Sequence, residues 1–259
     1  MYVEFDDIRQ SYVVAVNEIR KFIRGKKFLI YAACVALIFI AWTVIPFATG
    51  NSFEEAYEGG GGIVSTYISF MAILIMVGAT LFASNVIVSE FEDRTALVLF
   101  TRPIKKTPIF LGKILGCIVI EVFVIMLYYL GVAAVVLIVD GNVPSELFTS
   151  MELAFMYILS ASGVAVALSS ILKRSGTAAI ITFLFLLIGI SIPTGAMIIA
   201  GIDPWFMLDM AAAEMIPSDF VNGLPVIPMA HAARAMGVMA AWCVATMVLA
   251  WIAFIRREF

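Results

Sequence analysis

Charged residues are scarce in this chain, and histidine and cysteine are scarcer still. Asp, Glu, Lys and Arg make up 14% of the 259 residues, whereas a soluble domain has about 25%. The single histidine, His231, and three cysteines inside apolar runs show no spacing that suits a metal site. No G-x-x-x-x-G-K-[ST] sequence occurs, and Gly59–Gly62 is not followed by lysine. These absences exclude a P-loop ATPase, and we expect no catalytic residue, metal site or cofactor in this chain.

Apolar residues dominate the composition instead. They account for 63% of the chain, and the mean hydropathy is +1.07. A water-soluble domain of this size cannot cover so much apolar surface, so we expect lipid to surround most of it. The polar, acidic start Met1–Asp7 lacks the basic segment and the cleavage site of a secretory signal peptide. Membrane insertion is therefore expected to depend on the first span.

Six stretches of the sequence are long and apolar enough to cross a bilayer, for which about 20 residues are needed. We place these spans at residues 28–49, 63–88, 111–139, 151–172, 177–200 and 233–255. Residues 28–259 are expected to form one six-span transmembrane domain, and residues 1–27 a cytoplasmic segment. The predicted fold class is an all-α membrane protein.

Lys and Arg residues are distributed very unequally between the two sides of these spans. Of the sixteen, only Arg234 falls on the side where acidic residues predominate, and the others fall on the opposite side. Short loops rich in Lys and Arg remain in the cytoplasm. The segregation predicts a multi-pass plasma-membrane protein with both termini in the cytoplasm.

Residues 4–24 are predicted to form an amphipathic helix before the first span. Apolar residues recur there at steps of three and four, the spacing of one helix face. They are Phe5, Ile8, Tyr12, Val16, Ile19 and Ile23. Because basic residues follow this stripe beside a span, we expect the helix to lie in the cytoplasmic membrane interface. The alternative is a helix packed against cytoplasmic protein.

The segment Ser89–Pro103 is predicted to form a short helix between the second and third spans. Ser89 and Glu92 have the spacing of a capping box, which starts a helix. Residues 97–100 add an apolar patch, and Pro103 ends the helix. A charged helix with an apolar tip implies a partner surface. The alternative is a solvated loop with some buried apolar residues.

The sequence from Glu90 to Lys113 resembles the ABC-2 type transporter permeases. That family often shows an acidic residue, Gly-Thr, a Leu-rich turn, Pro, a basic pair and then Leu-Gly-Lys at the third span. The matching positions are Glu90, Thr95, Leu97, Leu99, Pro103, Lys105, Lys106, Leu111, Gly112 and Lys113. Arg94 stands where the family usually has Gly.

The resemblance implies a function and a set of partners. In that family the segment after the second span is a coupling helix that docks on a separate ATP-hydrolysing subunit. The chain would be the permease subunit of an ABC exporter, pairing with itself or with a related permease and binding two ATPase subunits. These subunits would hold ATP and Mg²⁺, and no nucleic acid is expected. The residues expected to bind the ATPase are Glu90, Glu92, Asp93, Arg94, Thr95, Leu97, Leu99 and Phe100.

Glu121 is the one acidic residue well inside a predicted span. Intramembrane carboxylates are costly and usually face protein or water, so a functional role is the default hypothesis. The alternative is a protonated or hydrogen-bonded acid that faces a neighbouring helix. In the same region, Gly112 and Gly116 predict a close-packing face.

Two features concern the later part of the chain. Pro193 predicts a kink or break in the fifth span. The Trp205–Ile216 stretch predicts a short helix at the outer membrane surface, within the longer external segment Gly201–Ala232.

Functions from other classes find less support in the sequence. An intramembrane protease needs a nucleophile with a base, or a metal set, and neither pattern occurs. An ion-coupled secondary transporter usually has repeated halves with matched broken helices, and we find no convincing repeat. A non-transporting membrane scaffold is compatible with the composition. The sequence identifies neither the substrate nor its direction of transport.

Overall fold

The computed structural model describes residues 5–49, 62–92, 106–217, 220–221, 224–225 and 231–256. The α-helices are α1 (Phe5–Arg24), α2 (Lys26–Thr49), α4 (Gly62–Ile68), α5 (Met71–Leu81), α6 (Val88–Glu92), α8 (Lys106–Val139), α9 (Ser145–Ile171), α10 (Ser175–Leu184), α11 (Ser191–Ile199), α12 (Leu208–Ala213) and α13 (Ala232–Arg256). The shorter elements are the 3₁₀ turn η2 (Ala83–Asn85), the π-helical segment η3 (Phe185–Gly189), β1 (Phe220–Val221) and β2 (Leu224–Pro225).

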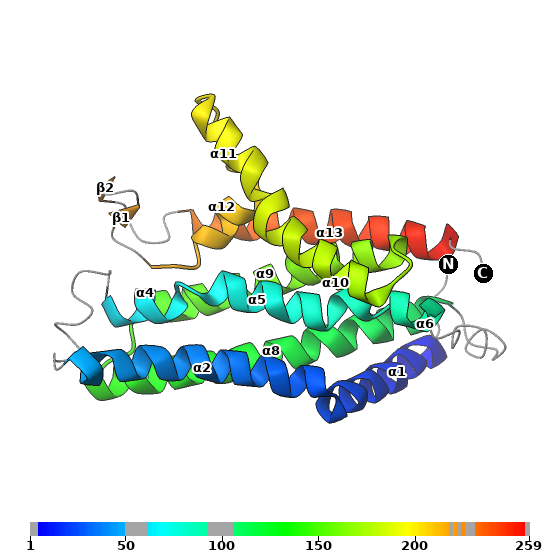
Figure 1. The fold of residues 1–259 in the computed structure, drawn as a ribbon, viewed down its shortest axis with the longest axis horizontal. Coiled ribbons are helices and arrows are strands. Elements are labelled where there is room, and N and C mark those ends of the chain that lie inside the picture. The colour runs from blue at the N-terminus through cyan, green and yellow to red at the C-terminus, as the bar shows by residue number, and fades with distance from the viewer. Residues whose placement is uncertain are drawn as a thin grey trace.

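Six stretches of helix in the described ranges are long and apolar enough to cross a membrane, which confirms the predicted number of spans. Most of them run along the long axis of the molecule, while α11 projects away from the other helices (Figure 1). The all-α class is confirmed as well, since β1 and β2 form only a two-residue antiparallel pairing. The third and fourth spans begin earlier than predicted, at Thr107 and Ser145.

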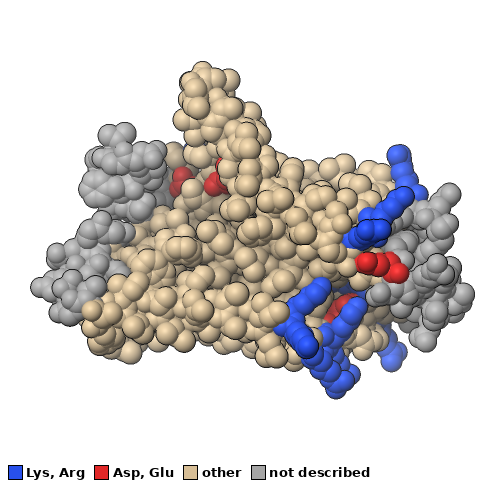
Figure 2. Space-filling model, in the orientation of Figure 1, with Lys and Arg blue, Asp and Glu red and all other residues tan. Residues whose placement is uncertain are grey.

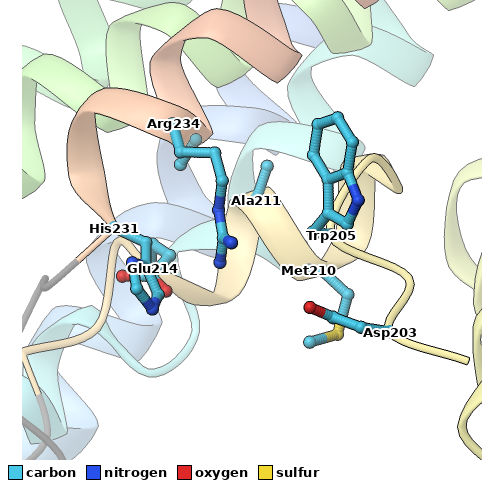
Figure 3. Close-up of a pocket in the computed structure, with 8 residues that line it drawn as sticks. Asp203, Trp205, Met210, Ala211, Glu214, His231 and Arg234 are labelled. Atoms are coloured by element: carbon cyan, nitrogen blue, oxygen red, sulfur yellow. The ribbon is translucent and has the colours of Figure 1, made fainter. Parts of the chain in front are cut away.

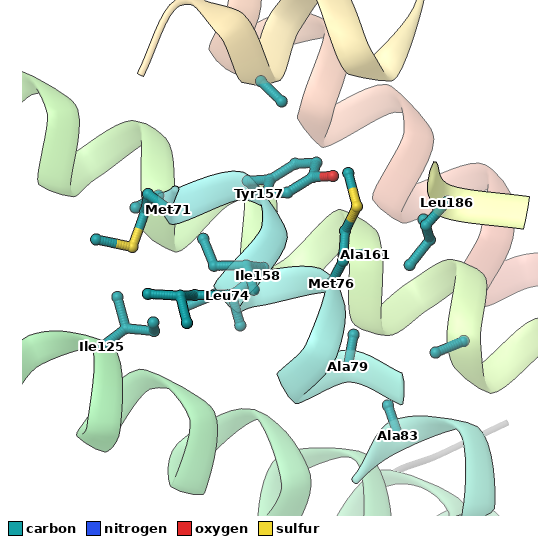
Figure 4. Packing of buried hydrophobic residues seen from close by; sticks show 14 of the residues in the cluster. Met71, Leu74, Met76, Ala79, Ala83, Ile125, Tyr157, Ile158, Ala161 and Leu186 are labelled. Atoms are coloured by element: carbon teal, nitrogen blue, oxygen red, sulfur yellow. The ribbon is translucent and has the colours of Figure 1, made fainter. Parts of the chain in front are cut away.

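Helix α9 lies at the centre of the bundle and packs along α13 and α5. Small residues let the helices approach closely: a Cβ atom added to Gly163 would collide with the hydroxyl oxygen of Thr246 on α13. Figure 4 shows Leu74 of α5 and Ile158 of α9 in one hydrophobic core with Ile125 of α8. Since lipid tails are as apolar as these side chains, close packing is what favours contact between the helices.

The fifth span is interrupted near Pro193, as predicted. Helix α10 ends at Leu184, and the π-helical segment η3 leads to α11. The amide of Ile190 donates to the carbonyl of Phe185, five residues earlier, at 3.1 Å. Because proline has no N–H for the carbonyl four residues before it, the regular hydrogen-bond pattern cannot continue through this point.

The short helix expected after the fifth span is present as α12. Its apolar residues Leu208, Ala211 and Ala212 are buried against the bundle. The loop before it is fixed to α13, because the indole N–H of Trp242 donates to the carbonyl of Phe206 at 3.0 Å. Helix α12 is thereby part of the packed core at this end of the bundle.

Helix α1 packs along the first turns of α8. A Cβ atom added to Gly112 would lie 2.5 Å from the carbonyl oxygen of Ser11, and one added to Gly116 would lie 2.8 Å from the Cβ atom of Glu18. The close-packing face predicted for these two glycines is confirmed, with α1 as its partner. Only the absence of side chains at both positions lets α1 come this close.

The buried face of α1 is not the predicted apolar stripe. Ser11, Ala15, Glu18 and Phe22 are buried. The stripe residues Ile8, Tyr12, Val16, Ile19 and Ile23 are exposed or half-buried. The apolar stripe is thus left open for a lipid environment. Its position in the membrane interface remains a prediction.

The contact between α1 and α8 yields a prediction about stability. Gly112→Ala places a methyl group against backbone and side-chain atoms of α1, and overpacking of this kind costs about 1–3 kcal/mol. We expect a lower unfolding temperature in a thermal scan of the detergent-solubilised protein. Gly237→Ala is the matched control, because no atom lies within 4 Å of its added Cβ on α13. Equal effects of the two substitutions would contradict tight packing at Gly112.

Candidate coupling site and buried polar groups

The second span ends in a broken helix that is held by the fourth span. After α5 the chain passes through η2 and a turn before α6 begins at Val88. The backbone amides of Ile87 and Val88 donate to Oγ of Ser169 on α9, at 3.2 and 3.1 Å. Ser169 is fully buried. One hydroxyl group therefore satisfies two amides at the break and fastens the start of α6 to α9.

The other end of α6 is held by the fifth span. Oε2 of Glu92 accepts a hydrogen bond from the backbone amide of Ser175, at 2.8 Å, at the first residue of α10. Hydrogen bonding from the side chain and from the backbone amide of Ser175, assisted by the charge of Arg174, lowers the pKa of the exposed Glu92 carboxyl below its usual value. A carboxylate at a helix N-terminus is also favoured by the helix dipole.

The predicted capping box of α6 is wrong in this detail. Ser89 lies inside α6, which begins one residue earlier, so it is not the N-cap. The carboxylate of Glu92 binds the N-terminus of α10 instead. The local pattern predicted that Glu92 would bind the backbone amide of Ser89. It binds the amide of Ser175 instead, which is distant in sequence.

A buried ion pair joins α1 to α8. Nζ of Lys113 lies 2.5 Å from Oε1 of Glu18, and both residues are buried. Lys21 lies 3.9 Å from the other carboxylate oxygen. The sequence indicated Lys113 as part of the family motif and as one of the basic residues on the cytoplasmic side, but it gave no signal for Glu18 as its partner.

Glu121 lies in the centre of the bundle, where four helices meet. It is fully buried, and its Oε2 accepts a hydrogen bond from Oγ of Ser162 on α9, at 3.2 Å. A Cβ atom on Gly78 of α5 would lie 2.6 Å from Oε1 of Glu121 and 2.8 Å from the hydroxyl of Tyr31 on α2. Neither of these two oxygens has a hydrogen-bond partner among the described residues. The carboxyl group therefore faces neighbouring helices, and Gly78 leaves the room for it.

A small pocket of about 40 Å³ lies beside α12, away from the end of the molecule where α1 begins and α13 ends (Figure 1). Its lining includes the carboxylates of Asp203 and Glu214 together with Arg234 (Figure 3). The side chain of Arg234 extends between Glu214 and His231 on one side and Trp205 on the other. Within the described ranges, no three His, Cys, Asp or Glu side chains lie close enough to hold a metal ion.

The chain matches the family model described as ABC-2 family transporter protein over residues 12–259. The chain belongs to this family. A comparison with curated proteins gives no match. Membership of the ABC-2 family agrees with the six spans and identifies the chain as a membrane transport component.

The expected ATPase-binding residues of this ABC-2 family member are only partly described by the structure. Glu92 is placed at the N-terminus of α10, and Glu90 lies in α6. The remaining expected residues lie outside the described ranges: Asp93, Arg94, Thr95, Leu97, Leu99 and Phe100. Docking of an ATPase through this segment therefore remains a prediction.

Sequence patterns did not single out the polar residues that hold the start of this segment. Ser169 lies in a serine-containing part of an otherwise apolar span, and Ser175 follows a basic pair. No local pattern distinguishes them from the other serines, because their partners are more than 80 residues away in sequence.

The ion pair between Glu18 and Lys113 yields a prediction that separates charge from packing. Glu18→Met or Lys113→Met alone breaks the buried ion pair and leaves one of its two charges in place, which costs about 3–5 kcal/mol. The double variant removes both charges and keeps apolar volume, so we expect it to recover most of the lost stability. A double-mutant cycle of unfolding temperatures in detergent measures this coupling. Additive losses would show that the two side chains do not act as a pair.

A second prediction concerns Glu121. A charged carboxylate in the bilayer is costly, so the surroundings suit a neutral acid, which the amide of Glu121→Gln reproduces in shape. We expect Glu121→Gln to insert normally and to unfold within about 1 kcal/mol of the parent.

Gly78→Ala at the same site should be more harmful. Its methyl group would meet both the carboxyl group and Tyr31, at a cost of about 1–3 kcal/mol. Gly195→Ala is the matched control, since no atom lies within 4 Å of its added Cβ.

A loss of several kcal/mol in Glu121→Gln would contradict a neutral acid at position 121.

Proposed function

We propose that this chain is the permease subunit of an ABC exporter that couples to a separate ATPase through residues 89–103. The observation that carries this proposal is the anchoring of α6, the helix in which this segment begins. Ser169 of α9 holds the start of α6, and Glu92 at its end holds the start of α10. A force applied to residues 93–103 would reach two membrane spans through these contacts.

The same contacts explain how ATP hydrolysis in a partner would change the membrane domain. Closure of two ATPase subunits displaces the coupling segment, and α6 moves with it. Because the amides of Ile87 and Val88 have no alternative partner in lipid, their bonds to Ser169 are expected to persist during this movement. Helices α9 and α10 are then tilted together with α6.

The distribution of basic residues supports the proposed orientation. Lys and Arg gather at one end of the molecule (Figure 2), where α1 begins and α13 ends. By the positive-inside rule this end faces the cytoplasm, and the plasma membrane is the proposed location. The described basic residues assigned to this side include Arg9, Arg20, Lys21, Arg24, Lys26, Lys27, Lys113, Lys173, Arg174 and Arg256.

The proposed assembly contains two permease chains and two ATPase subunits. The second permease is either a copy of this chain or a relative. ATP and Mg²⁺ bind to the ATPase subunits, because this sequence has no phosphate-binding loop of its own. The permease contributes movement of its helices and no catalytic group.

Co-purification tests this proposal directly. The full-length chain is affinity-purified from its native membrane in mild detergent, and the co-purifying chains are identified and assayed for ATP hydrolysis. We expect a P-loop ATPase in equal amount to the permease. Asp93→Lys reverses one charge in the coupling segment and should reduce the amount of bound ATPase by about tenfold.

Asp140→Lys is the matched control, because it makes the same change at an exposed position in the loop after α8, on the opposite side of the membrane. Glu92 is unsuitable for the charge reversal, since its carboxylate also binds α10. A monodisperse permease without any ATPase would contradict the proposal and favour an ion-coupled transporter or a scaffold.

A further inference from the structure

We propose that the groove between α1, α8 and α13 binds one anionic phospholipid from the cytoplasmic leaflet. The groove has a volume of about 1050 Å³, just above the range of small-molecule pockets, which hold about 300–1,000 Å³. Its lining is largely apolar and includes Tyr12 and Val16 of α1, Leu115 and Val119 of α8, and Met247 of α13. The orientation assumed here is the one given under the proposed function.

The groove exists because α1 is held against only one side of α8. Gly112 and Gly116 bring the Ser11 and Glu18 face of α1 close to α8, and the ion pair with Lys113 fixes this face. Among the described residues, no helix packs on the next face of α1. Tyr12 of that face is 68% exposed, and Leu115 across the groove is 47% exposed.

The depth of the groove indicates a lipid as its occupant. Met247 lies nine residues before Arg256, or about 13 Å deeper along α13 at 1.5 Å per residue. The groove therefore extends from the basic end of the bundle into the hydrocarbon layer, where acyl chains are available. Phe110 closes its side through ring contacts with Trp251 and Phe254, at centroid distances of 5.1 and 5.4 Å.

The charge beside the groove indicates an anionic headgroup. Arg9 and Arg20 lie on the same row of α1 as Tyr12 and Val16, with spacings of three and four residues. Both arginines are exposed. Asp7 is the one acidic residue in the lining, at the end of α1 away from Arg20. A guanidinium group forms two parallel hydrogen bonds with a phosphate, so this row suits a phosphodiester better than a neutral or cationic surface.

Lipid binding to the isolated permease tests the proposal. The delipidated full-length protein is titrated with phosphatidylglycerol or phosphatidylcholine, and bound lipid is counted by native mass spectrometry. We expect one phosphatidylglycerol per chain, with weaker binding of phosphatidylcholine. The double variant Arg9→Gln and Arg20→Gln should lower phosphatidylglycerol affinity by about tenfold, to the level of phosphatidylcholine.

Two matched controls make the outcome specific. Lys26→Gln with Lys173→Gln removes the same charge from exposed positions outside α1 and should leave the affinity unchanged. Leu115→Trp fills the groove and should abolish binding of both lipids, whereas Leu130→Trp, at an exposed position of α8 outside the groove, should not.

Three outcomes would overturn the lipid site. The first is an equal loss of phosphatidylglycerol affinity in both charge variants. The second is unchanged lipid binding by Leu115→Trp. The third is that Leu115→Trp loses permease dimers while its lipid count stays the same. The last would identify the groove as an interface between copies. Since this titration contains no ATPase, its failure is distinguishable from failure of the proposed coupling function.

Discussion

Every backbone N–H and C=O inside a lipid bilayer needs a partner within the protein, because hydrocarbon offers none. This constraint explains where polar side chains lie in this otherwise apolar chain. At the break after α5, the hydroxyl of Ser169 accepts from two amides that an unbroken helix would have satisfied. At the break in the fifth span, a π-helical turn restores the bond of Ile190 before Pro193. A helix can be interrupted in the membrane only where such a substitute exists, and here it is a tertiary contact at the first break and a local π-helical bond at the second.

The sequence predicted those features that depend on composition and short-range pattern. Hydropathy located the six spans, and Pro193 located the break in the fifth. Features set by tertiary partners escaped prediction or were assigned wrongly. Ser89 and Glu92 matched a local capping pattern, but α10 offered the carboxylate a helix N-terminus distant in sequence. The pairing of Glu18 with Lys113 could not be predicted, because no local pattern in either segment indicates that α1 packs on α8.

Helix α1 has a different partner on each of three faces, and the buried ion pair determines which face meets α8. Burial of the charged residues Glu18 and Lys113 at this contact costs desolvation energy. The hydrogen-bonded ion pair offsets that cost only partly. Its benefit is specificity: the pair forms only when the face of α1 that carries Glu18 meets Lys113, which disfavours a rotation of α1 that would bury its apolar stripe against the bundle instead. The exposed stripe, with Ile8 at 60% exposure, is then available to lipid, and the polar face is left for water.

The two contacts that hold α6 differ in how firmly they can transmit a displacement. The bond from Ser175 to Glu92 is exposed, so water competes for both partners and salt screens the charge. It also depends on pH: since the folded pKa of Glu92 is below its usual value, the bond is present at neutral pH and is lost as the pH falls through the folded pKa. The contact with Ser169 is buried, contains no titratable group, and leaves amides unsatisfied if it breaks, at about 1–3 kcal/mol for each. In the proposed coupling mechanism, the contact with Ser169 of α9 is therefore the firmer of the two, and the Glu92 contact with α10 is the one more easily lost under load.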